Sequence, residues 1–579
     1  MKRIAIWSAA LTGLTVTGLG QTTGAPNQTT PVAAQATEAS GATAPATTAP
    51  AGYKVEEQLL GTWDWMPTSL LGPGNIAFSS DMLHIAYVGR RKYEGKYKVC
   101  IVLDGQAEAK PVIAGISAFG MTGGIGPHSA TGLALSPDGK RVAYGTKKDK
   151  KWVVVIDGQA GAEYDELDLN MNPGPDSKRA VFSADSKHVV YAAKKGGKWL
   201  VVVDGKADTE YDKIWEPKFS PDSQRMAYGA LRKNLWSVVV DGHAGAEYDG
   251  LSVLRFSPNS QRVAYGAQRG MQWLVIVDGH PSAEYEDISD LVFSPDSKRV
   301  AYAVKKGAKW LLVVDGQAGA EYDEIQDLRF SPDSKRVAYE ARNGVKWLVV
   351  LDGQAGAEYD KIQDLRFSPD GQRVAYGAQR GKQWLVMVDG HPSAEYDKIW
   401  GLQFSPDGQR VAYGAQRDKH WLVMVDGHLS AEYEDISGLV FSPDSKRVAY
   451  QARPGKKWLV VVEGQAGEEY DEIQGLKFSL DGKHVAYVTT KYKAGFSTNM
   501  MRILDLQDAD MIRGKATWSV VVDGQPSADY GLMPGGFATF SADGGLEFLA
   551  VKLATTFKSA MVSASPEGTL YRVKYTPVP

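Results

Sequence analysis

Paired carboxylates are the most frequent groups in this sequence that could do chemistry. Asp323 and Glu324 are one example, and a glycosidase needs only two carboxyl groups on opposite sides of a sugar. A catalytic pair has to be singular, however, whereas these acids return at a regular interval along the chain. The pattern therefore favours solvated edge and turn residues over an active site.

Four histidines each follow an Asp-Gly pair and could suggest a ring of metal ligands. They are His243, His280, His391 and His428. At least one whole repeated unit separates each histidine from the next, which places them farther apart than the ligands of one metal ion. We interpret them as surface turn residues.

Other catalytic and cofactor motifs are missing from the sequence. It contains no His-Glu-x-x-His pattern, no pair of cysteine ligands, no phosphate-binding loop and no Gly-x-Ser-x-Gly elbow. The segment GGIG, residues 123–126, lacks a third spaced glycine and a helix, so we interpret it as a loop. We expect no catalytic residue, no cofactor and no metal.

Ten of the 15 tryptophans occupy one position of a repeated unit, where they could form a ladder on which a ligand stacks. They stand at the start of the most apolar segment of the unit, next to Lys or Gln, so packing between units is the favoured explanation. These residues are Trp152, Trp199, Trp236, Trp273, Trp310, Trp347, Trp384, Trp421, Trp458 and Trp518.

The repeated unit that positions these residues is 37 residues long. A Phe-Ser pair marks nine regular copies, and looser copies begin at Phe78, Leu135 and Phe540, which makes twelve. The regular copies begin at Phe182, Phe219, Phe256, Phe293, Phe330, Phe367, Phe404, Phe441 and Phe478.

Each unit contains four strand signals and no helix signal. In the unit that begins at Ile362, DLRFS, QRVAYGA and WLVMV are three strands, and the polar AEYDK is a fourth strand suited to an outer edge. Units whose apolar faces need a neighbour on each side are typical of β-propeller blades, with an open β-solenoid as the rival. We predict an all-β propeller with Val263, Val300 and Val374 in the core between blades.

The number of units bears on the number of rings. Twelve four-stranded blades exceed the four to eight of a usual propeller, so we predict two six-bladed rings, residues 53–325 and 326–579, divided near Ile325. The alternative is one large ring, because the 37-residue spacing continues through Ile325 without an added linker.

The amino-terminal segment has the form of a secretory signal. After MKR comes an uncharged apolar run from Ile4 to Gly20, and cleavage after Ala25 fits the requirement for small residues, with Ala36 as a second option. A retained membrane anchor is the other explanation, because the run is at the short limit for a span. We expect residues 1–25 to be the signal peptide, and no stable transmembrane segment after cleavage.

Two further features concern the spacer after this segment and the cysteine content. Residues 26–52 are rich in Ala, Thr and Pro and have few large apolar groups, which predicts a disordered spacer. Cys100 is the only cysteine, so the chain has no internal disulfide, and its apolar neighbours predict that it is buried.

The string FSPDGQRVAYGA, followed by an apolar strand ending in VDG, resembles the WD-like repeat of TolB-type β-propellers. The resemblance extends from about Gly74 to Val578 and implies the propeller fold. This repeat also occurs in translocation factors, in the propellers of prolyl-oligopeptidase-like peptidases and in other exported proteins, so it does not identify a function. TolB itself resembles one six-bladed propeller behind a small α/β domain, and no such domain is visible here.

Net charge narrows the class of partner. Lys and Arg number 65 against 68 Asp and Glu, and the formal charge of -3 gives no positive field for a nucleic acid. We expect an exported, non-catalytic scaffold, periplasmic or extracellular, that binds a protein or a cell-envelope polymer. The alternatives are a propeller hydrolase or lyase acting on polysaccharide and a structural surface protein.

Two insertions interrupt the repeat and point to the predicted site. Residues 117–132 lengthen a blade-to-blade connector, and residues 491–517 interrupt a turn between the second and third strands of a blade. Propeller topology puts both connections on one face, where turns are basic and connectors acidic, so their charges should largely neutralise each other. We predict a site on that face, unless both loops are merely tolerated. Its predicted contacts are His128, Tyr492, Phe496 and Arg502.

Overall fold

The computed structural model describes residue 50 and residues 53–63, 76–93, 96–107, 131–148, 150–168, 181–493, 516–541, 543–553 and 568–578. These residues belong to one compact unit, Thr47–Pro579. The described part of the chain is all-β, and its one helical segment is the short 3-10 turn η2 (Pro534–Gly536). No helix in these ranges is long and apolar enough to cross a membrane.

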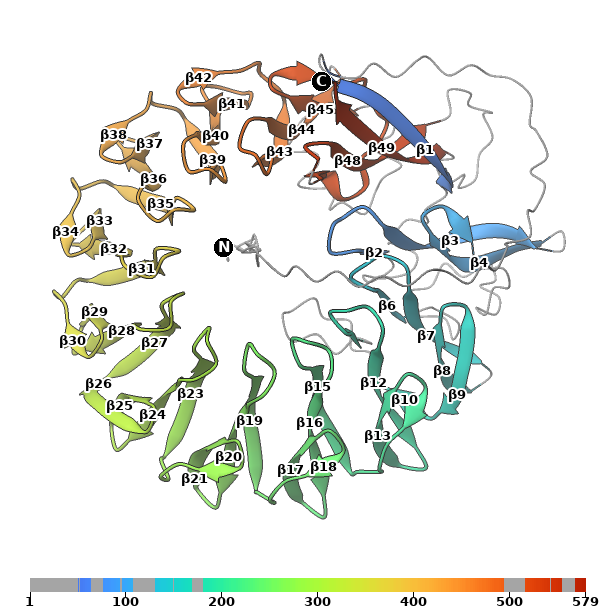
Figure 1. Ribbon diagram of the computed structural model, residues 1–579, viewed down its shortest axis with the longest axis vertical. Coiled ribbons are helices and arrows are strands. Elements are labelled where there is room, and N and C mark those ends of the chain that lie inside the picture. Colours follow the sequence, from blue (N-terminus) through green and yellow to red (C-terminus); the bar gives the residue numbers. More distant parts are fainter. Residues whose placement is uncertain are drawn as a thin grey trace, which may run out of the picture. The chain divides into compact units, whose positions relative to one another are not determined.

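The strands form twelve antiparallel sheets, which are the blades of a β-propeller (Figure 1). The predicted fold class is therefore confirmed. We number the blades along the chain and call the four strand positions A to D, from the centre of the ring outwards. In blade 3 the A position is divided between two short strands, β10 and β11, which both pair with β12.

The A and B strands carry the inner half of each blade. The A strands are β2 (Ile76–Phe78), β6 (Thr131–Leu135), β10 (Glu166–Leu167) with β11 (Val181–Phe182), β15 (Lys213–Phe219), β19 (Gly250–Phe256), β23 (Asp287–Phe293), β27 (Glu324–Phe330), β31 (Lys361–Phe367), β35 (Lys398–Phe404), β39 (Asp435–Phe441), β43 (Glu472–Phe478) and β47 (Ala538–Phe540). The B strands are β3 (Ile85–Tyr93), β7 (Val142–Lys148), β12 (Val189–Lys195), β16 (Met226–Arg232), β20 (Val263–Arg269), β24 (Val300–Lys306), β28 (Val337–Asn343), β32 (Val374–Arg380), β36 (Val411–Arg417), β40 (Val448–Arg453), β44 (Val485–Tyr492) and β48 (Leu546–Leu553).

The C and D strands carry the outer half. The C strands are β4 (Lys96–Leu103), β8 (Lys151–Ile156), β13 (Lys198–Val203), β17 (Leu235–Val240), β21 (Gln272–Val277), β25 (Lys309–Val314), β29 (Lys346–Leu351), β33 (Gln383–Val388), β37 (His420–Val425), β41 (Leu459–Val462), β45 (Ala516–Val522) and β49 (Gly568–Pro577). The D strands are β5 (Gln106–Ala107), β9 (Gln159–Tyr164), β14 (Lys206–Ala207), β18 (His243–Ala244), β22 (His280–Pro281), β26 (Gln317–Tyr322), β30 (Gln354–Ala355), β34 (His391–Pro392), β38 (His428–Leu429), β42 (Gln465–Ala466), β46 (Gln525–Pro526) and β1 (Tyr53–Trp63).

Local turn chemistry fixes the register of these strands. The C–D hairpin of blade 8 turns at Asp389 and Gly390, which both have positive φ, 51° and 82°. Asp-Gly is a favoured pair for such two-residue hairpins because both positions need a left-handed backbone. The A–B turn of blade 6 is held by side chains: Ser294 Oγ donates to Asp296 Oδ1 at 2.6 Å and accepts from the backbone N of Arg299 at 3.0 Å.

An arginine at the end of the A–B turn ties eight of the blades to the next. In blade 6, Arg299 Nε donates to Asp315 Oδ2 at 2.8 Å, and its Nη1 donates to the Lys335 carbonyl of blade 7 at 2.9 Å. Its guanidinium carbon also lies 5.2 Å from the ring centre of Phe330. We call this set of contacts the interblade latch. The arginine that makes it in eight blades is Arg141, Arg225, Arg262, Arg299, Arg336, Arg373, Arg410 or Arg447.

Apolar side chains fill the space between blades. Val300 is buried in a cluster with Ala264 and Val275 of the preceding blade, and Val263 and Val374 take the same place in their own clusters. The prediction for these three valines is therefore confirmed. Cys100 is also buried, as predicted.

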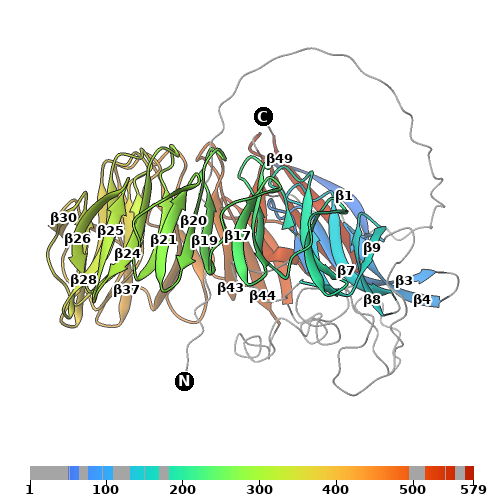
Figure 2. The ribbon, with the colours of Figure 1, turned by 90° about the horizontal axis from the view of Figure 1, so that it is seen from below.

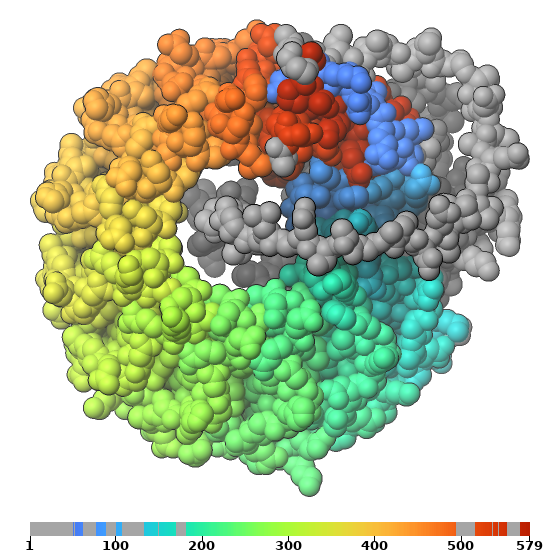
Figure 3. Space-filling view, viewed as in Figure 1, coloured from blue at the N-terminus to red at the C-terminus, as the bar shows by residue number. Residues whose placement is uncertain are grey.

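The twelve blades make one ring. At the predicted division, Ile325 lies in a single core cluster with Leu312 of blade 6 and Leu348 of blade 7, so packing continues across this point. The preferred prediction of two six-bladed rings is wrong, and the alternative of one large ring is the observed architecture (Figure 1). Figure 2 shows the blades standing side by side, and Figure 3 shows that they surround a central opening.

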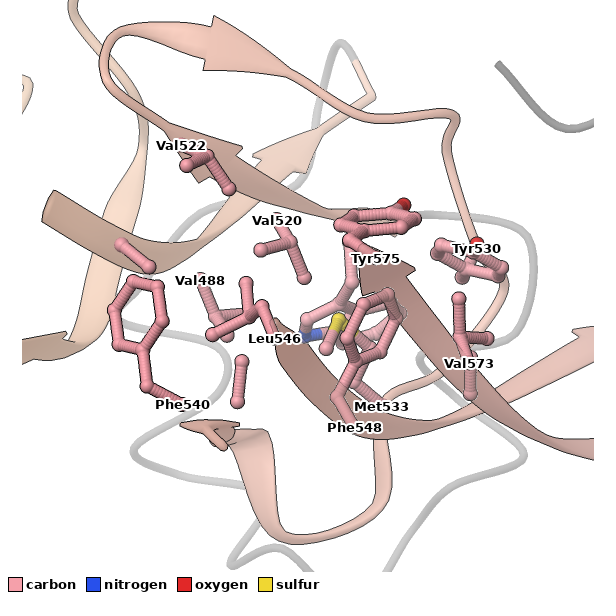
Figure 4. Close-up of a cluster of buried hydrophobic side chains, with 14 of the residues drawn as sticks. Val488, Val520, Val522, Tyr530, Met533, Phe540, Leu546, Phe548, Val573 and Tyr575 are labelled. Atoms are coloured by element: carbon pink, nitrogen blue, oxygen red, sulfur yellow. The ribbon is translucent and has the colours of Figure 1, made fainter. Parts of the chain in front are cut away.

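The ring closes through a strand from the start of the described chain. β1 is the outer strand of blade 12 and pairs with β49 from Tyr53 opposite Pro577 to Trp63 opposite Gly568. On the side of blade 11, blade 12 packs through the cluster that contains Phe548 and Tyr575 (Figure 4). On the side of blade 1, Leu60 is buried with residues of β3 and β4.

Blade 12 uses a different arginine for its latch. Its A–B turn is one residue shorter than in the regular units and lacks the arginine. Arg572, on β49, donates instead to the Leu83 carbonyl of blade 1 at 3.1 Å and contacts His84 Nδ1 at 2.9 Å. In the regular latch the accepting carbonyl belongs to the residue just before the latch position of the next blade, as Lys335 precedes Arg336. Leu83 precedes His84 in the same way. The seam between blades 12 and 1 is therefore latched from another strand.

Candidate binding surface on the inner wall

Three of the four predicted contact residues, His128, Phe496 and Arg502, lie outside the described residues. The fourth, Tyr492, ends β44 and packs partly buried against the core cluster between blades 11 and 12. Its backbone N donates to Asp471 Oδ2 at 2.7 Å. Burial and the nearby carboxylate of Glu472 raise the pKa of Tyr492. The described contacts of Tyr492 are those of a packing residue.

The predicted pairing of basic turns with acidic connectors is present. Asp323, in the connector after blade 6, accepts from Lys309 Nζ at 2.7 Å and from the backbone N of Gly344 at 2.6 Å. Gly344 belongs to the B–C turn of blade 7, so turns and connectors share one face and neutralise each other. Neighbouring Glu324 pairs with Arg342 at 3.0 Å. The carboxylates that recur therefore join neighbouring blades, as Asp323 does, or strands of one blade, as Glu324 does.

The other repeated residues also have structural positions. His243, His280, His391 and His428 each begin a D strand and are exposed, in agreement with their interpretation as turn residues. Within the described ranges, no group of three or more His, Cys, Asp or Glu side chains could hold a metal ion. Trp310 packs against the core cluster between blades 6 and 7, which supports packing as the role of the repeated tryptophans.

The A strands of blades 4 to 11 carry positions at which the side chain varies from blade to blade. Each of these strands is the inner edge of its blade (Figure 1). We call three partly or fully exposed positions on each strand the inner wall. Its residues are Trp215, Glu216, Lys218, Ser252, Val253, Arg255, Ser289, Asp290, Val292, Gln326, Asp327, Arg329, Gln363, Asp364, Arg366, Trp400, Gly401, Gln403, Ser437, Gly438, Val440, Gln474, Gly475 and Lys477.

A β-bulge shapes the inner wall in every one of these blades. The pairing of β27 with β28 shifts between Gln326 and Arg329, and Asp327, inside the shift, has φ 53°. The same left-handed residue is Val253 in blade 5, although β-branched residues rarely adopt this conformation. A bulge ends regular pairing at an exposed edge strand and turns side chains in new directions. The backbone conformation at these positions is therefore the same in each blade, while the residue types differ.

Blades 4 to 8 form a charged arc of the inner wall. Lys218 Nζ lies 3.0 Å from Glu216 Oε1, and Arg329 Nη2 lies 2.6 Å from Asp327 Oδ1. Asp290 precedes Asp327 by one blade; loss of hydration and then the negative charge of Asp327 raise the pKa of Asp290. The charged arc therefore holds acids and bases in close pairs.

A buried carboxyl lies behind the charged arc. Glu340 is 3% exposed, and its Oε2 accepts from Gln326 Nε2 at 2.8 Å. Burial raises the pKa of Glu340, and the charge of Asp327 adds a smaller contribution in the same direction. At the same register blade 8 has Gly377, and blade 10 has Gln451, which accepts from Ser437 at 3.0 Å.

We expect Glu340→Gln to stabilise the ring at neutral pH. A raised folded-state pKa means that ionisation of Glu340 opposes folding once the pH exceeds the unfolded value, about 4.3. The amide removes that penalty, and Gln451 shows that the blade accommodates it. Thermal unfolding should give a higher Tm for the variant at pH 7 and a smaller difference at pH 4. An equal or lower Tm at pH 7 would show that the carboxylate is well compensated.

Blades 9 to 11 form the rest of the inner wall, and we call all of it except Lys477 the uncharged arc. It consists of Trp400, Gly401, Gln403, Ser437, Gly438, Val440, Gln474 and Gly475, with Phe537 next to Gly475. Trp400 is 39% exposed and Phe537 is 42% exposed. Lys477 stands at the end of this arc, and burial lowers its pKa. Sequence reasoning missed both arcs. An alignment of the repeats would show them as the columns in which the residue type changes from blade to blade.

Comparisons with known proteins give distant similarities over part of the chain. No protein-family model matches the sequence, and no curated protein matches it. A solved structure of the eukaryotic initiation factor is 14% identical, with a TM-score of 0.31 over 58% of this chain and 94% of that chain. TolB from Acinetobacter baumannii is 16% identical, with a TM-score of 0.21 over 46% of this chain and 80% of that chain. The Dos1 propeller is 15% identical, with a TM-score of 0.26 over 58% and 91%. These similarities carry no argument about function, and the TolB-type family stays a prediction.

Proposed function

We propose that this protein is an exported, non-catalytic scaffold that binds a protein or a cell-envelope polymer at the inner wall of its ring. One observation carries the proposal: the same bulge recurs in every blade from 4 to 11, while the residue inside it changes from Glu216 to Val253, to aspartates and to glycines. Packing explains a repeated residue. A fixed backbone with varied side chains is suited to recognition.

The repeated polar groups also support a binding surface at the inner wall, because they are already engaged in contacts that hold the fold together. The turn serines, latch arginines and connector aspartates join strands or blades, so they are not available as a separate site. Export is supported by the apolar run from Ile4 to Gly20. For the alternative of a polysaccharide hydrolase, Glu340 has the raised pKa of a general acid, but it is buried behind Gln326 and does not reach the surface.

Binding by matched triple variants tests the proposal. The wall variant combines Asp327→Ala, Arg329→Ala and Trp400→Ala, which removes one ion pair and one exposed aromatic ring. A control variant with Arg417→Ala, Glu432→Ala and Leu429→Ala removes one ion pair and one exposed apolar side chain from the outer part of blade 9.

The immobilised full chain should retain a component of cell-envelope extract. We expect the wall variant to lose at least tenfold in affinity for that component, and the control to stay within twofold. Circular dichroism spectra and Tm values establish that both variants are folded. Equal binding by the wall variant, or no retained component for any form, would contradict the proposed function.

A further inference from the structure

The charge of the inner wall changes along the ring at one register position. The residue inside the bulge is Asp290, Asp327 and Asp364 in blades 6 to 8, and a glycine in blades 9 to 11. All six positions have the same left-handed backbone, with φ between 49° and 67°. The change from aspartate to glycine therefore removes a negative charge and a side chain from the inner wall, while the backbone conformation stays the same.

Trp400 supplies an exposed aromatic surface in the uncharged arc. Its Cε3 lies 3.3 Å from the point that a Cβ atom on Gly414 would occupy, so the indole rests against the backbone of β36. Ile436 of blade 10 approaches the same point to 2.5 Å. A larger residue at position 414 would displace both side chains. The glycine thus allows the indole to lie against the sheet with part of its surface exposed.

Phe537 and several amides complete the surface. Phe537 Cδ1 lies 3.2 Å from the position of a Cβ atom on Gly475, and the Gln474 side chain beside it is exposed. Gln403 Nε2 donates to the Leu439 carbonyl at 2.8 Å, which holds this amide between blades 9 and 10. The uncharged arc therefore combines exposed aromatic carbon with neutral donors and acceptors.

These groups favour a ligand that has apolar faces and neutral hydroxyl groups. An aromatic ring with a polar neighbourhood suits a ligand that is apolar on one side and hydrated on the other. A cationic ligand would lose hydration there without an opposite charge to pair with, and an anionic ligand would meet only the partly buried Lys477 at the end of the arc, so ionised ligands are disfavoured. A sugar ring has apolar C–H faces and uncharged hydroxyls that amides can bind. This chemistry identifies one class of occupant.

We propose that the uncharged arc binds a neutral oligosaccharide chain across Trp400, Gln474 and Phe537. The inference rests on the proposed function, because it specifies the ligand class of the inner wall. The charged arc then carries no part of the glycan site. Replacing glycine by aspartate inside the bulge should convert the uncharged arc locally into the charged one.

Gly401→Asp is the sharpest variant for this test. No atom lies within 4 Å of a Cβ atom on Gly401, whose φ is 65°, and Asp364 has φ 56° at the same register of blade 8. The variant is therefore expected to fold. Gly381→Asp is the matched control: it adds the same charge to a B–C turn with φ 64° and open space, where blade 9 already has Asp418 at φ 51°.

Titration calorimetry with the full chain would use cellohexaose, maltohexaose and chitohexaose as neutral probes, and hexagalacturonate as an anionic probe of the same length. We expect at least one neutral probe to bind and hexagalacturonate to bind at least tenfold more weakly. Gly401→Asp and Trp400→Ala should each weaken neutral binding at least tenfold, and Gly381→Asp less than twofold.

Three outcomes would overturn the inference: no neutral probe binds, the anionic probe binds equally well, or Gly401→Asp and Gly381→Asp behave alike while both stay folded. Retention of an envelope component that depends on the wall variant would then leave the proposed function standing. If the wall variant retains that component as well as the unmodified chain does, the proposed function fails as well.

Discussion

Replacing Gly61 with valine is expected to force the ring apart at its seam and to lower the free energy of unfolding by about 1–3 kcal/mol. A Cβ atom on Gly61 would lie 2.4 Å from the carbonyl oxygen of Gly105 and 2.9 Å from its Cα. Both neighbours are backbone atoms of the C–D turn of blade 1, so no side chain can rotate away. β1 and blade 1 have to separate to admit the new atoms.

Leu59→Val is the matched control for this prediction. Leu59 lies on the same strand and is 63% exposed, so its substitution should change the free energy of unfolding by less than about 0.5 kcal/mol. Urea unfolding gives the free energies, and hydrogen exchange should show faster exchange in β1 and β49 for Gly61→Val alone. If both variants unfold and exchange alike, the close approach of Gly61 to Gly105 does not limit ring closure.

Acid is expected to destabilise the whole ring as the pH falls from about 4 to about 2. The aspartates of the A–B turns have lowered pKa values, to about 2 for Asp185 and Asp543, first because a serine hydroxyl donates to each carboxylate and then because a backbone N–H does. The pKa of an aspartate in an unfolded chain is about 3.9. Stability from a depressed pKa is present above the unfolded value and is lost as the pH falls through the folded one.

Two acids of the inner wall oppose this trend. The pKa values of Asp290 and Glu340 are raised, so protonation of these groups favours the folded state. The turn aspartates act in the other direction and are more numerous. The described turns with a lowered aspartate pKa are those of Asp138, Asp185, Asp222, Asp296, Asp333, Asp370, Asp407, Asp444, Asp481 and Asp543.

Blade 5 supplies the variant that tests the acid prediction. It has Asn259 in place of the aspartate, and Ser257 Oγ still lies 2.7 Å from Asn259 Oδ1. Changing Asp296, Asp333 and Asp370 to asparagine keeps the turn and removes three titrating groups. Circular dichroism between pH 5 and pH 2 should show a lower midpoint of acid unfolding for the triple variant. An unchanged midpoint would show that other groups control acid unfolding.

The blades could be predicted from the sequence because one unit contains all the information for its own strands. The position of Val300 between blades follows from strand alternation and the 37-residue period. The number of rings depends on the angle between neighbouring blades. Small differences in packing set this angle, and the length of the repeat contains no information about it. The strand β1 was missed because the outer strand of a regular unit is short and polar, and residues 53–63 do not resemble it.

The inner wall was missed for a related reason. Asp364 and Gly401 are not singular chemical groups, and in the sequence of one unit they resemble a turn acid and a spacer. Their importance comes from the bulge, which shifts pairing by one residue and which a strand pattern of period two does not reveal. Comparing equivalent positions in neighbouring blades distinguishes the residues that the backbone conformation requires from the residues that differ between blades.

Hydrogen exchange of the full chain, free and with its retained envelope component, tests the inner wall most directly. We predict slower exchange on binding in the A strands β35, β39 and β43, with unchanged exchange in the outer strands β38 and β42. Protection confined to the outer strands, or to the B–C turns of the rim, would contradict the assignment of the inner wall as the binding surface.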